Sequence, residues 1–249
     1  MASNDHRSSY QNYPHLTKRE FTEACHLLDR RYRQATLGPL RRQWRLNVHT
    51  ALELNFQAGS GSTTFLQITR PLDNATAADD ELAASMGSIS LRNPPRGRYN
   101  MRDRGNATMV EMEDADMEVY RRPSRATYDV PHVKYEIHLH PTYRVPCLWF
   151  SLHHLPEGES ALNFETVIQR LVPEQYRESI RNTGPIGGIS LDHHPVTGVP
   201  SFFIHPCALG ETMAGFQCSK DDYLMVWLGL VGGCVGLWVP NQMATVNAG

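Results

Sequence analysis

The sequence lacks the features by which several large classes of protein are recognised. No two of its five cysteines show the CxxC spacing, and an odd, scattered set indicates reduced thiols in a cytosolic protein rather than a disulfide framework. Residues 1–13 are polar and contain no apolar core of a secretory signal. The formal net charge of −2 offers no basic surface of the kind that binds nucleic acid. We therefore expect a cytoplasmic protein without a nucleic-acid partner.

Patterns that hold a cofactor or a metal ion are also missing. The glycines at positions 184, 187 and 188 match neither of the standard phosphate-binding spacings. The histidines and cysteines in the C-terminal third fit no familiar zinc-finger spacing; they are His193, His194, His205, Cys207 and Cys218. We therefore expect no cofactor and no structural metal.

One long apolar run raises the question of a membrane anchor. Residues 223–239 carry no charge, but the run is slightly shorter than the roughly 20 residues that a spanning helix needs. Two acids, Asp221 and Asp222, precede it. We expect a single buried helix capped by Asp221 and no stable membrane insertion, with a tail anchor as the alternative.

The remaining pattern predicts an α+β domain in which helices pack on an antiparallel sheet. Thr17 and Glu20 form a capping box that begins a helix, and Gly38 with Pro39 ends it. Strict alternation predicts a strand over residues 44–56, followed by a turn at the glycines and serines of residues 59–62. The other predicted elements are strands over residues 63–69, 133–139, 145–152, 189–193 and 201–204, a helix begun by Asn163 over residues 163–172, and a short turn over residues 174–181. The first four strands form the sheet, and the last two form a small hairpin.

Residues 71–128 differ in composition from the rest of the chain. They contain few large apolar residues, a cluster of arginines and a cluster of acids, so they cannot bury enough surface to offset the entropy of ordering. We expect a disordered N-terminus over residues 1–13, one domain over residues 14–240 with a disordered insertion at residues 71–128, and a tail over residues 241–249. A docking loop for a partner remains the functional alternative for the insertion.

The tripeptide His205-Pro206-Cys207 is the sharpest local candidate for chemistry. It follows a short strand and precedes an irregular segment, so the thiol should be partly exposed, as a nucleophile must be. A structural cysteine beside a rigid proline is the plainer interpretation. A cysteine protease would need a histidine base, and His205 lies only two residues away. These alternatives remain open on residue chemistry alone.

Three segments in order resemble the autophagy-related protein 10 family. The first is Lys134-Tyr135-Glu136-x-His138 with Tyr143-x-Val145-Pro146-x-Leu148-x-Phe150; the second is His194-Pro195-x-x-Gly198-x-Pro200 with Ile204-His205-Pro206-Cys207; the third comprises Tyr223, Trp227-Leu228, Val231-Gly232, Val235-Gly236-Leu237 and Pro240. The match runs over residues 133–240 and is weaker over residues 16–70. The chain departs from the family at Gly233 and Cys234, where proline and valine are common, and at Ser201, where an aromatic is common.

The resemblance implies a divergent ubiquitin-conjugating-enzyme fold and a transferase that carries its modifier as a thioester on Cys207. His205 and Pro206 would frame that thiol, and Lys134, Tyr135 and Glu136 are candidate partner-binding residues. The implied partners are the ubiquitin-like autophagy protein 12, the activating enzyme autophagy-related protein 7 and the acceptor autophagy-related protein 5. The implied place is the cytoplasm, with recruitment to pre-autophagosomal structures.

The resemblance also leaves one chemical role unassigned. Ordinary ubiquitin-conjugating enzymes stabilise the developing oxyanion with the asparagine of a His-Pro-Asn tripeptide, and here Cys207 stands in that third position. Asn182 is one candidate substitute. Three alternatives remain: a conjugating enzyme for lipid-linked modifiers of the autophagy-related protein 3 type, a tail-anchored interaction protein, and a catalytically silent adaptor of the same fold.

Overall fold

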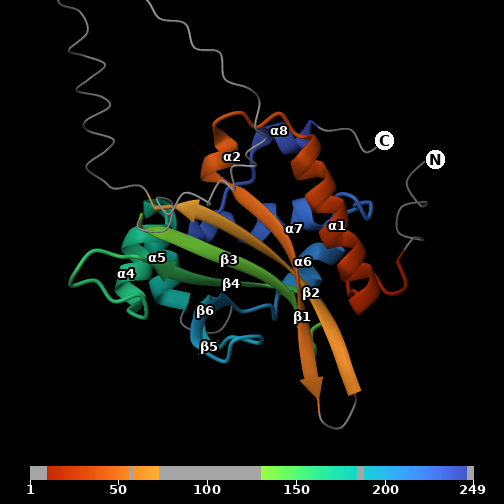
Figure 1. Cartoon of the computed structure of the whole chain (residues 1–249), viewed down its shortest axis with the longest axis horizontal. Coiled ribbons are helices and arrows are strands. Elements are labelled where there is room, and N and C mark those ends of the chain that lie inside the picture. The colour runs from red at the N-terminus through yellow and green to blue at the C-terminus, as the bar shows by residue number, and fades with distance from the viewer. Residues whose placement is uncertain (1–9, 56–58, 73–129, 184–187, 246–249) are drawn as a thin grey trace, which may run out of the picture. The chain divides into compact units, whose positions relative to one another are not determined.

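The computed structural model describes residues 10–55, 59–72, 130–183 and 188–245 (Figure 1). All of these residues belong to one structural unit, Met1–Leu72 with Val130–Gly249. The expectation about the insertion at residues 71–128 therefore lies almost wholly outside the described residues.

A six-stranded antiparallel sheet organises the unit. Its strands lie in the order β1-β2-β3-β4-β6-β5. Their bounds are β1 Arg45–Asn55, β2 Gly59–Pro71, β3 His132–Leu139, β4 Pro146–His153, β5 Ile189–His193 and β6 Pro200–Ile204. The α+β class is thus confirmed, but the hairpin of β5 and β6 extends the sheet rather than standing apart from it. Two residue pairs, Trp149 with Phe203 and Phe150 with Phe202, make this connection.

The turn between the first two strands is not where the glycines predicted it. Asn55 pairs with Gly59 and Glu53 with Gly61, so residues 59–62 lie within β2. The prediction of a turn at residues 59–62 is therefore wrong. Glycine and serine permit a turn, but the pairing register decides where it forms.

The helices begin at the capping signals that the sequence carries. Helix α1 spans Lys18–Gln34, and its capping box of Thr17 and Glu20 is present. Helix α4 spans Phe164–Leu171, and Asn163 accepts a hydrogen bond from the backbone of Glu165. The other α-helices among the described residues are α2 Leu40–Gln43, α5 Glu174–Thr183, α6 Leu209–Ala214, α7 Tyr223–Val231 and α8 Asn241–Ala244. Helix α5 is thus a full helix where a short turn was expected.

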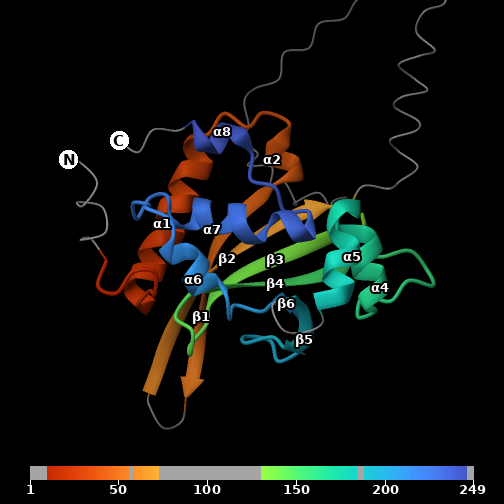
Figure 2. The same ribbon diagram turned by 180° about the vertical axis from the view of Figure 1, so that it is seen from behind.

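Helices α1 and α7 cover one face of the sheet, and α7 crosses in front of it in Figure 2. Alternate side chains along strand β3 point toward this layer of helices. Val133, Tyr135 and Ile137 are fully buried toward it, together with Tyr223 and Trp227 of α7. Burial of such large side chains is the main source of stability in a domain of this size.

The apolar run at residues 223–239 is not a single helix. Helix α7 ends at Val231, a 3-10 turn covers Gly233–Val235, and Gly236 takes a φ of +68°. A side chain at Gly232 would lie 2.2 Å from the carbonyl oxygen of Leu237, so the chain needs glycine there. The N-cap is Asp222 rather than Asp221, and Asp222 accepts a hydrogen bond from Arg31 instead of capping the helix. In the part of the chain that the structure describes, no helix is long and apolar enough to cross a membrane.

The domain also extends past both predicted boundaries. Tyr10 and Met243 are buried in the hydrophobic core, although residues 1–13 and 241–249 were expected to lie outside the domain. Tyr10 donates a hydrogen bond to the carbonyl oxygen of Ser219. Residues 10–13 are therefore part of the folded unit.

Candidate active site

Cys207 lies in the turn between β6 and α6, and its side chain is partly exposed. It lines a crevice of about 350 Å³. Three parts of the chain form this crevice: residues 14 and 15 before α1, residues 143 and 145 after β3, and residues 206–214 of the Cys207 turn and α6. The lining residues are Pro14, His15, Tyr143, Val145, Pro206, Cys207, Gly210, Glu211 and Ala214. An acyl group on the thiol could therefore be approached from solvent.

His205 holds the backbone of Cys207. The ring nitrogen that does so, Nδ1, is therefore not available to the thiol. The Nδ1 atom of His205 accepts a hydrogen bond of 3.2 Å from the backbone N–H of Cys207. Because Nδ1 accepts, the neutral ring carries its proton on Nε2. This arrangement does not supply the histidine base that a cysteine protease requires of His205. Pro206 is buried next to it and stiffens the turn.

The same use of histidine occurs in two seven-residue turns with the pattern His-Pro-x-x-x-Val-Pro, at residues 140–146 and 194–200. In each turn the Nδ1 atom of the histidine accepts from the backbone N–H groups two and three residues later. The residue four positions on, Arg144 or Gly198, has a φ of +53° or +67° and donates its N–H to the histidine carbonyl. Sequence reasoning missed this repeat, although its spacing is visible.

The other four thiols are placed less favourably for reaction as nucleophiles. Cys25 and Cys147 are buried, and burial raises the pKa of the Cys147 thiol to about 12 and that of Cys25 even further. Cys218 is buried too, although it lies in a polar segment of the sequence, and its sulfur lies 3.4 Å from the hydroxyl of Tyr13. Cys234 is half-buried, donates to the carbonyl of Val231, and has a pKa raised to about 11 by burial.

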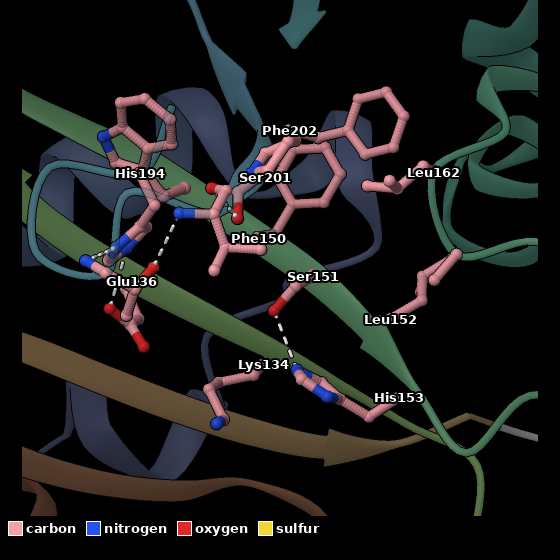
Figure 3. A pocket seen from close by; sticks show the side chains of 15 residues that line it. Lys134, Glu136, Phe150, Ser151, Leu152, His153, Leu162, His194, Ser201 and Phe202 are labelled. Carbon is pink, nitrogen blue, oxygen red and sulfur yellow. Dashed lines mark hydrogen bonds and ion pairs between the residues drawn. The ribbon is translucent and has the colours of Figure 1, made fainter. Parts of the chain in front are cut away.

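The stretch Lys134-Tyr135-Glu136 is divided between the two faces of the sheet. Tyr135 is fully buried and donates to the carbonyl oxygen of Val235, so it cannot contact a partner at the surface. Lys134 and Glu136 project from the opposite face, where Figure 3 shows them around a pocket. The alternation of side chains along β3 separates residues that are neighbours in the sequence.

Glu136 is the centre of a hydrogen-bonded cluster. One carboxylate oxygen lies 2.9 Å from His194 Nε2 (Figure 3). The same oxygen lies 3.1 Å from His138 Nε2, and the other oxygen accepts from Gln67. Burial alone would raise the pKa of Glu136, but the three hydrogen bonds outweigh it and hold the pKa below its ordinary value. Burial lowers the pKa of His138. The cluster therefore favours an ionised Glu136 carboxylate beside a neutral His138 imidazole.

These three residue types could hold a metal ion, since their ligand atoms lie within 4.8 Å of one another. The hydrogen bonds of His194 argue against that use. Its Nδ1 accepts from the backbone of Val196 and Thr197, so its proton is on Nε2 and points at Glu136. A metal at Nε2 would need this proton removed. We therefore describe the three residues as a hydrogen-bonded cluster.

The structure gives no support to Asn182 as the oxyanion donor. It is exposed at the end of α5 and is not among the residues that line the crevice of Cys207. The crevice instead contains His15 and Glu211, which sequence reasoning did not single out. No local pattern marks His15, because it joins the crevice of Cys207 only in the folded chain.

The chain matches the family model described as "Autophagocytosis associated protein, active-site domain" over residues 20–242. It is 49% identical over 236 residues to a protein of Gibberella zeae named ubiquitin-like-conjugating enzyme ATG10, which covers 95% of this chain and 99% of that protein. A human protein of the same name is 33% identical over 124 residues, 47% of this chain and 54% of that protein.

The antiparallel sheet with its helices, the turn at Cys207 and these matches define the class of the molecule: it is a ubiquitin-like-protein transferase of the divergent ubiquitin-conjugating fold. Within that class, the chain belongs to the ATG10 family of ubiquitin-like-conjugating enzymes of autophagy.

Proposed function

We propose that Cys207 is the thiol that carries the modifier of this conjugating enzyme. The ubiquitin-like autophagy protein 12 arrives as a thioester on the activating enzyme, autophagy-related protein 7, and its C-terminal carbonyl passes to Cys207. A lysine of autophagy-related protein 5 then attacks that carbonyl. The reaction takes place in the cytoplasm, at or near pre-autophagosomal structures.

The observation that carries the proposal is the environment of Cys207 compared with that of the other thiols. Cys207 lies in a turn, is partly exposed and borders an open crevice. Cys25, Cys147 and Cys218 are buried. A thiol must be reached by an incoming carbonyl and must ionise, and burial in apolar surroundings opposes both.

The reaction does not require a thiol with a lowered pKa. An ordinary free thiol has a pKa of about 8.5, so a few per cent is thiolate at neutral pH. The thioester keeps the acyl group activated, and the enzyme holds the thioester and the amine together. Positioning of this kind can lower a barrier by roughly 7–11 kcal/mol. The hydrogen bond from Cys207 N–H to His205 and the rigid Pro206 support that positioning role.

Lys134 and Glu136 belong to the proposal as partner-binding residues of the open sheet face. They border a pocket of about 390 Å³ whose walls come from β4, β6 and the loop before α4. Among the described residues, Lys134 forms no ion pair, so its charge is available to a partner's carboxylate. Tyr135 has no part in this contact because it is buried.

The test is a non-reducing gel after incubation with the activating enzyme, nucleotide and modifier. A reducible adduct of the conjugating enzyme is expected, and addition of the acceptor should convert it into an irreducible conjugate. If no reducible adduct forms, the chain is a silent adaptor of the same fold.

A further inference from the structure

Residues 10–16 hold His15 firmly at the edge of the crevice. The backbone N–H of His15 donates to Asn12, and Leu16 and Arg144 are joined by a backbone hydrogen bond of 2.7 Å. Tyr223 donates its hydroxyl to the carbonyl oxygen of Pro14 at 2.6 Å. The peptide on either side of His15 is thus tied to the turn at residues 140–146 and to α7. The imidazole is therefore presented from a fixed backbone.

The hydrogen bond of the His15 ring determines which nitrogen carries the proton. Its Nδ1 lies 3.0 Å from the carbonyl oxygen of Tyr143, and a carbonyl can only accept. The proton is therefore on Nδ1, and Nε2 has a free lone pair. Among the described residues, no hydrogen bond or ion pair occupies that nitrogen.

The other two histidines near Cys207 have the opposite tautomer. His205 Nδ1 accepts from the backbone of Cys207, and His140 Nδ1 accepts from Thr142 and Tyr143. Both rings therefore carry their proton on Nε2 and would lose their backbone hydrogen bonds on gaining a second proton. Of these three rings, His15 is the one whose free nitrogen can take up a proton without breaking its anchor.

His15 also faces the reacting thiol's own segment. It lines the same crevice as Cys207, and its Cε1 atom, which joins the two ring nitrogens, would lie 3.2 Å from a side-chain carbon at Gly210. The other titratable groups of the crevice are Tyr143 and Glu211. Around it lie His140, Arg144 and His205, all on the adjoining turns, and the ring of Tyr143 is 5.7 Å from that of His205.

We propose that His15 is the general base that removes a proton from the attacking lysine during transfer of the modifier from Cys207. This inference rests on the proposed function and assigns a further residue of the same site. A base within reach of the nucleophile and oriented by a third group is the arrangement that nucleophilic transfer requires. The Tyr143 carbonyl is that third group here.

The step balances without any further reactant. The lysine ammonium first loses one proton to solvent, and its nitrogen attacks the thioester carbonyl. The C–N bond forms, the C–S bond breaks, and Cys207 leaves as a thiolate. His15 Nε2 takes a proton from the attacking nitrogen and returns it to the Cys207 thiolate. The products are an amide, the free thiol and one proton.

The test separates formation of the thioester from its discharge. The variant His15→Gln can still donate a hydrogen bond to the Tyr143 carbonyl but has no basic nitrogen. We expect it to form the thioester as wild type does and to discharge it to the acceptor about 100-fold or more slowly. The pH profile of the discharge rate should differ between wild type and the variant, because glutamine has no nitrogen that can take up a proton. His26→Gln, an exposed histidine of α1, is the matched control and should behave as wild type.

Two further measurements exclude a structural role. Hydroxylamine is largely unprotonated at pH 7 and is a much stronger nucleophile than lysine, so its discharge of the thioester should slow far less in His15→Gln than discharge to lysine does. Added imidazole should restore part of the lysine discharge in His15→Ala. Equal loss of thioester formation and of discharge to both nucleophiles would overturn the assignment, and so would an unchanged pH profile in His15→Gln. If wild type itself forms no thioester, the proposed function fails and not this inference alone.

Discussion

The two His-Pro-x-x-x-Val-Pro turns have the same backbone geometry and different surroundings. In both, the histidine Nδ1 accepts two backbone N–H groups and the fifth residue has a positive φ. His194 then places its Nε2 against the partly buried Glu136, whereas His140 lies beside the exposed Tyr143 at the crevice. One turn fastens the β5–β6 hairpin to the sheet, and the other forms a wall of the proposed active site. The two turns share a local sequence, and the residues that surround each histidine ring determine the role of each turn.

Alanine substitutions at His194 and His140 should give the largest difference in the free energy of unfolding. His194→Ala removes a donor from the carboxylate of Glu136 and leaves two backbone N–H groups without their acceptor. We expect it to lower the free energy of unfolding by about 3 kcal/mol, because a partly buried charge loses a partner. His140→Ala loses the same backbone acceptor at a more exposed site and should cost about 1 kcal/mol.

Urea denaturation of both variants at pH 7 measures this difference. Equal losses would show that the turn alone, and not the contact with Glu136, gives His194 its importance.

The Glu136 cluster should make stability depend on pH on the acid side. The pKa of the Glu136 carboxyl in the folded chain is lower than the ordinary 4.5 despite burial, because His138, His194 and Gln67 donate hydrogen bonds to the carboxylate. The stabilisation is therefore complete above about pH 4.5 and is lost as the pH falls toward the folded pKa. The lowered pKa of His138 acts in the same direction, since stability also falls as the pH drops below its ordinary 6.5.

Unfolding free energies between pH 3 and 7 test this dependence. Glu136→Gln should be less stable than wild type at pH 7 and should lose less stability as the pH falls. Glu157→Gln, at an exposed position, should follow the wild-type curve. A Glu136→Gln curve parallel to wild type would mean that this carboxylate does not control the acid limb.

The smallest effect concerns the fifth position of the turn. Gly198 has a φ of +67° and open space around it, so Gly198→Ala should lower stability by about 1 kcal/mol through backbone strain alone. Gly229→Ala in α7 meets open space as well but has an ordinary helical backbone, so it should raise stability by about 0.5–1 kcal/mol. Thermal unfolding of the two variants distinguishes the signs. A destabilised Gly229→Ala would point to a packing cost in place of a backbone effect.

Local signals in the sequence predicted the elements whose causes are local. The capping box of Thr17 and Glu20, the cap at Asn163 and the alternation along β3 all gave the observed structure. Distant contacts decided the rest. Periodicity could not show that α7 stops at Val231, because the close approach of Leu237 to Gly232 imposes the break. Likewise, Cys218 is buried by Tyr13 and its neighbours, which lie some 205 residues away.

The residues of the proposed site also fall into those with a local signal in the sequence and those without one. The motif at residues 205–207 was visible in the sequence, and so was its resemblance to a family. His15 was assigned to no site, because nothing near it in the sequence suggests chemistry. The fold brings it to Tyr143, 128 residues away, and thereby fixes its tautomer. Polar residues that act through long-range contacts carry no periodic or spacing signal, so sequence reasoning finds them last.

The most direct test of the central claim follows the thioester through single cysteine variants. Wild type incubated with activating enzyme, nucleotide and modifier should give an adduct that a reducing agent removes. Cys207→Ala should give none, and Cys207→Ser should give an adduct that survives reduction, because an alkoxide is a poorer leaving group than a thiolate. The four single alanine variants at Cys25, Cys147, Cys218 and Cys234 should keep the reducible adduct. An adduct that survives Cys207→Ala and disappears in one of those four would contradict the assignment of the nucleophile.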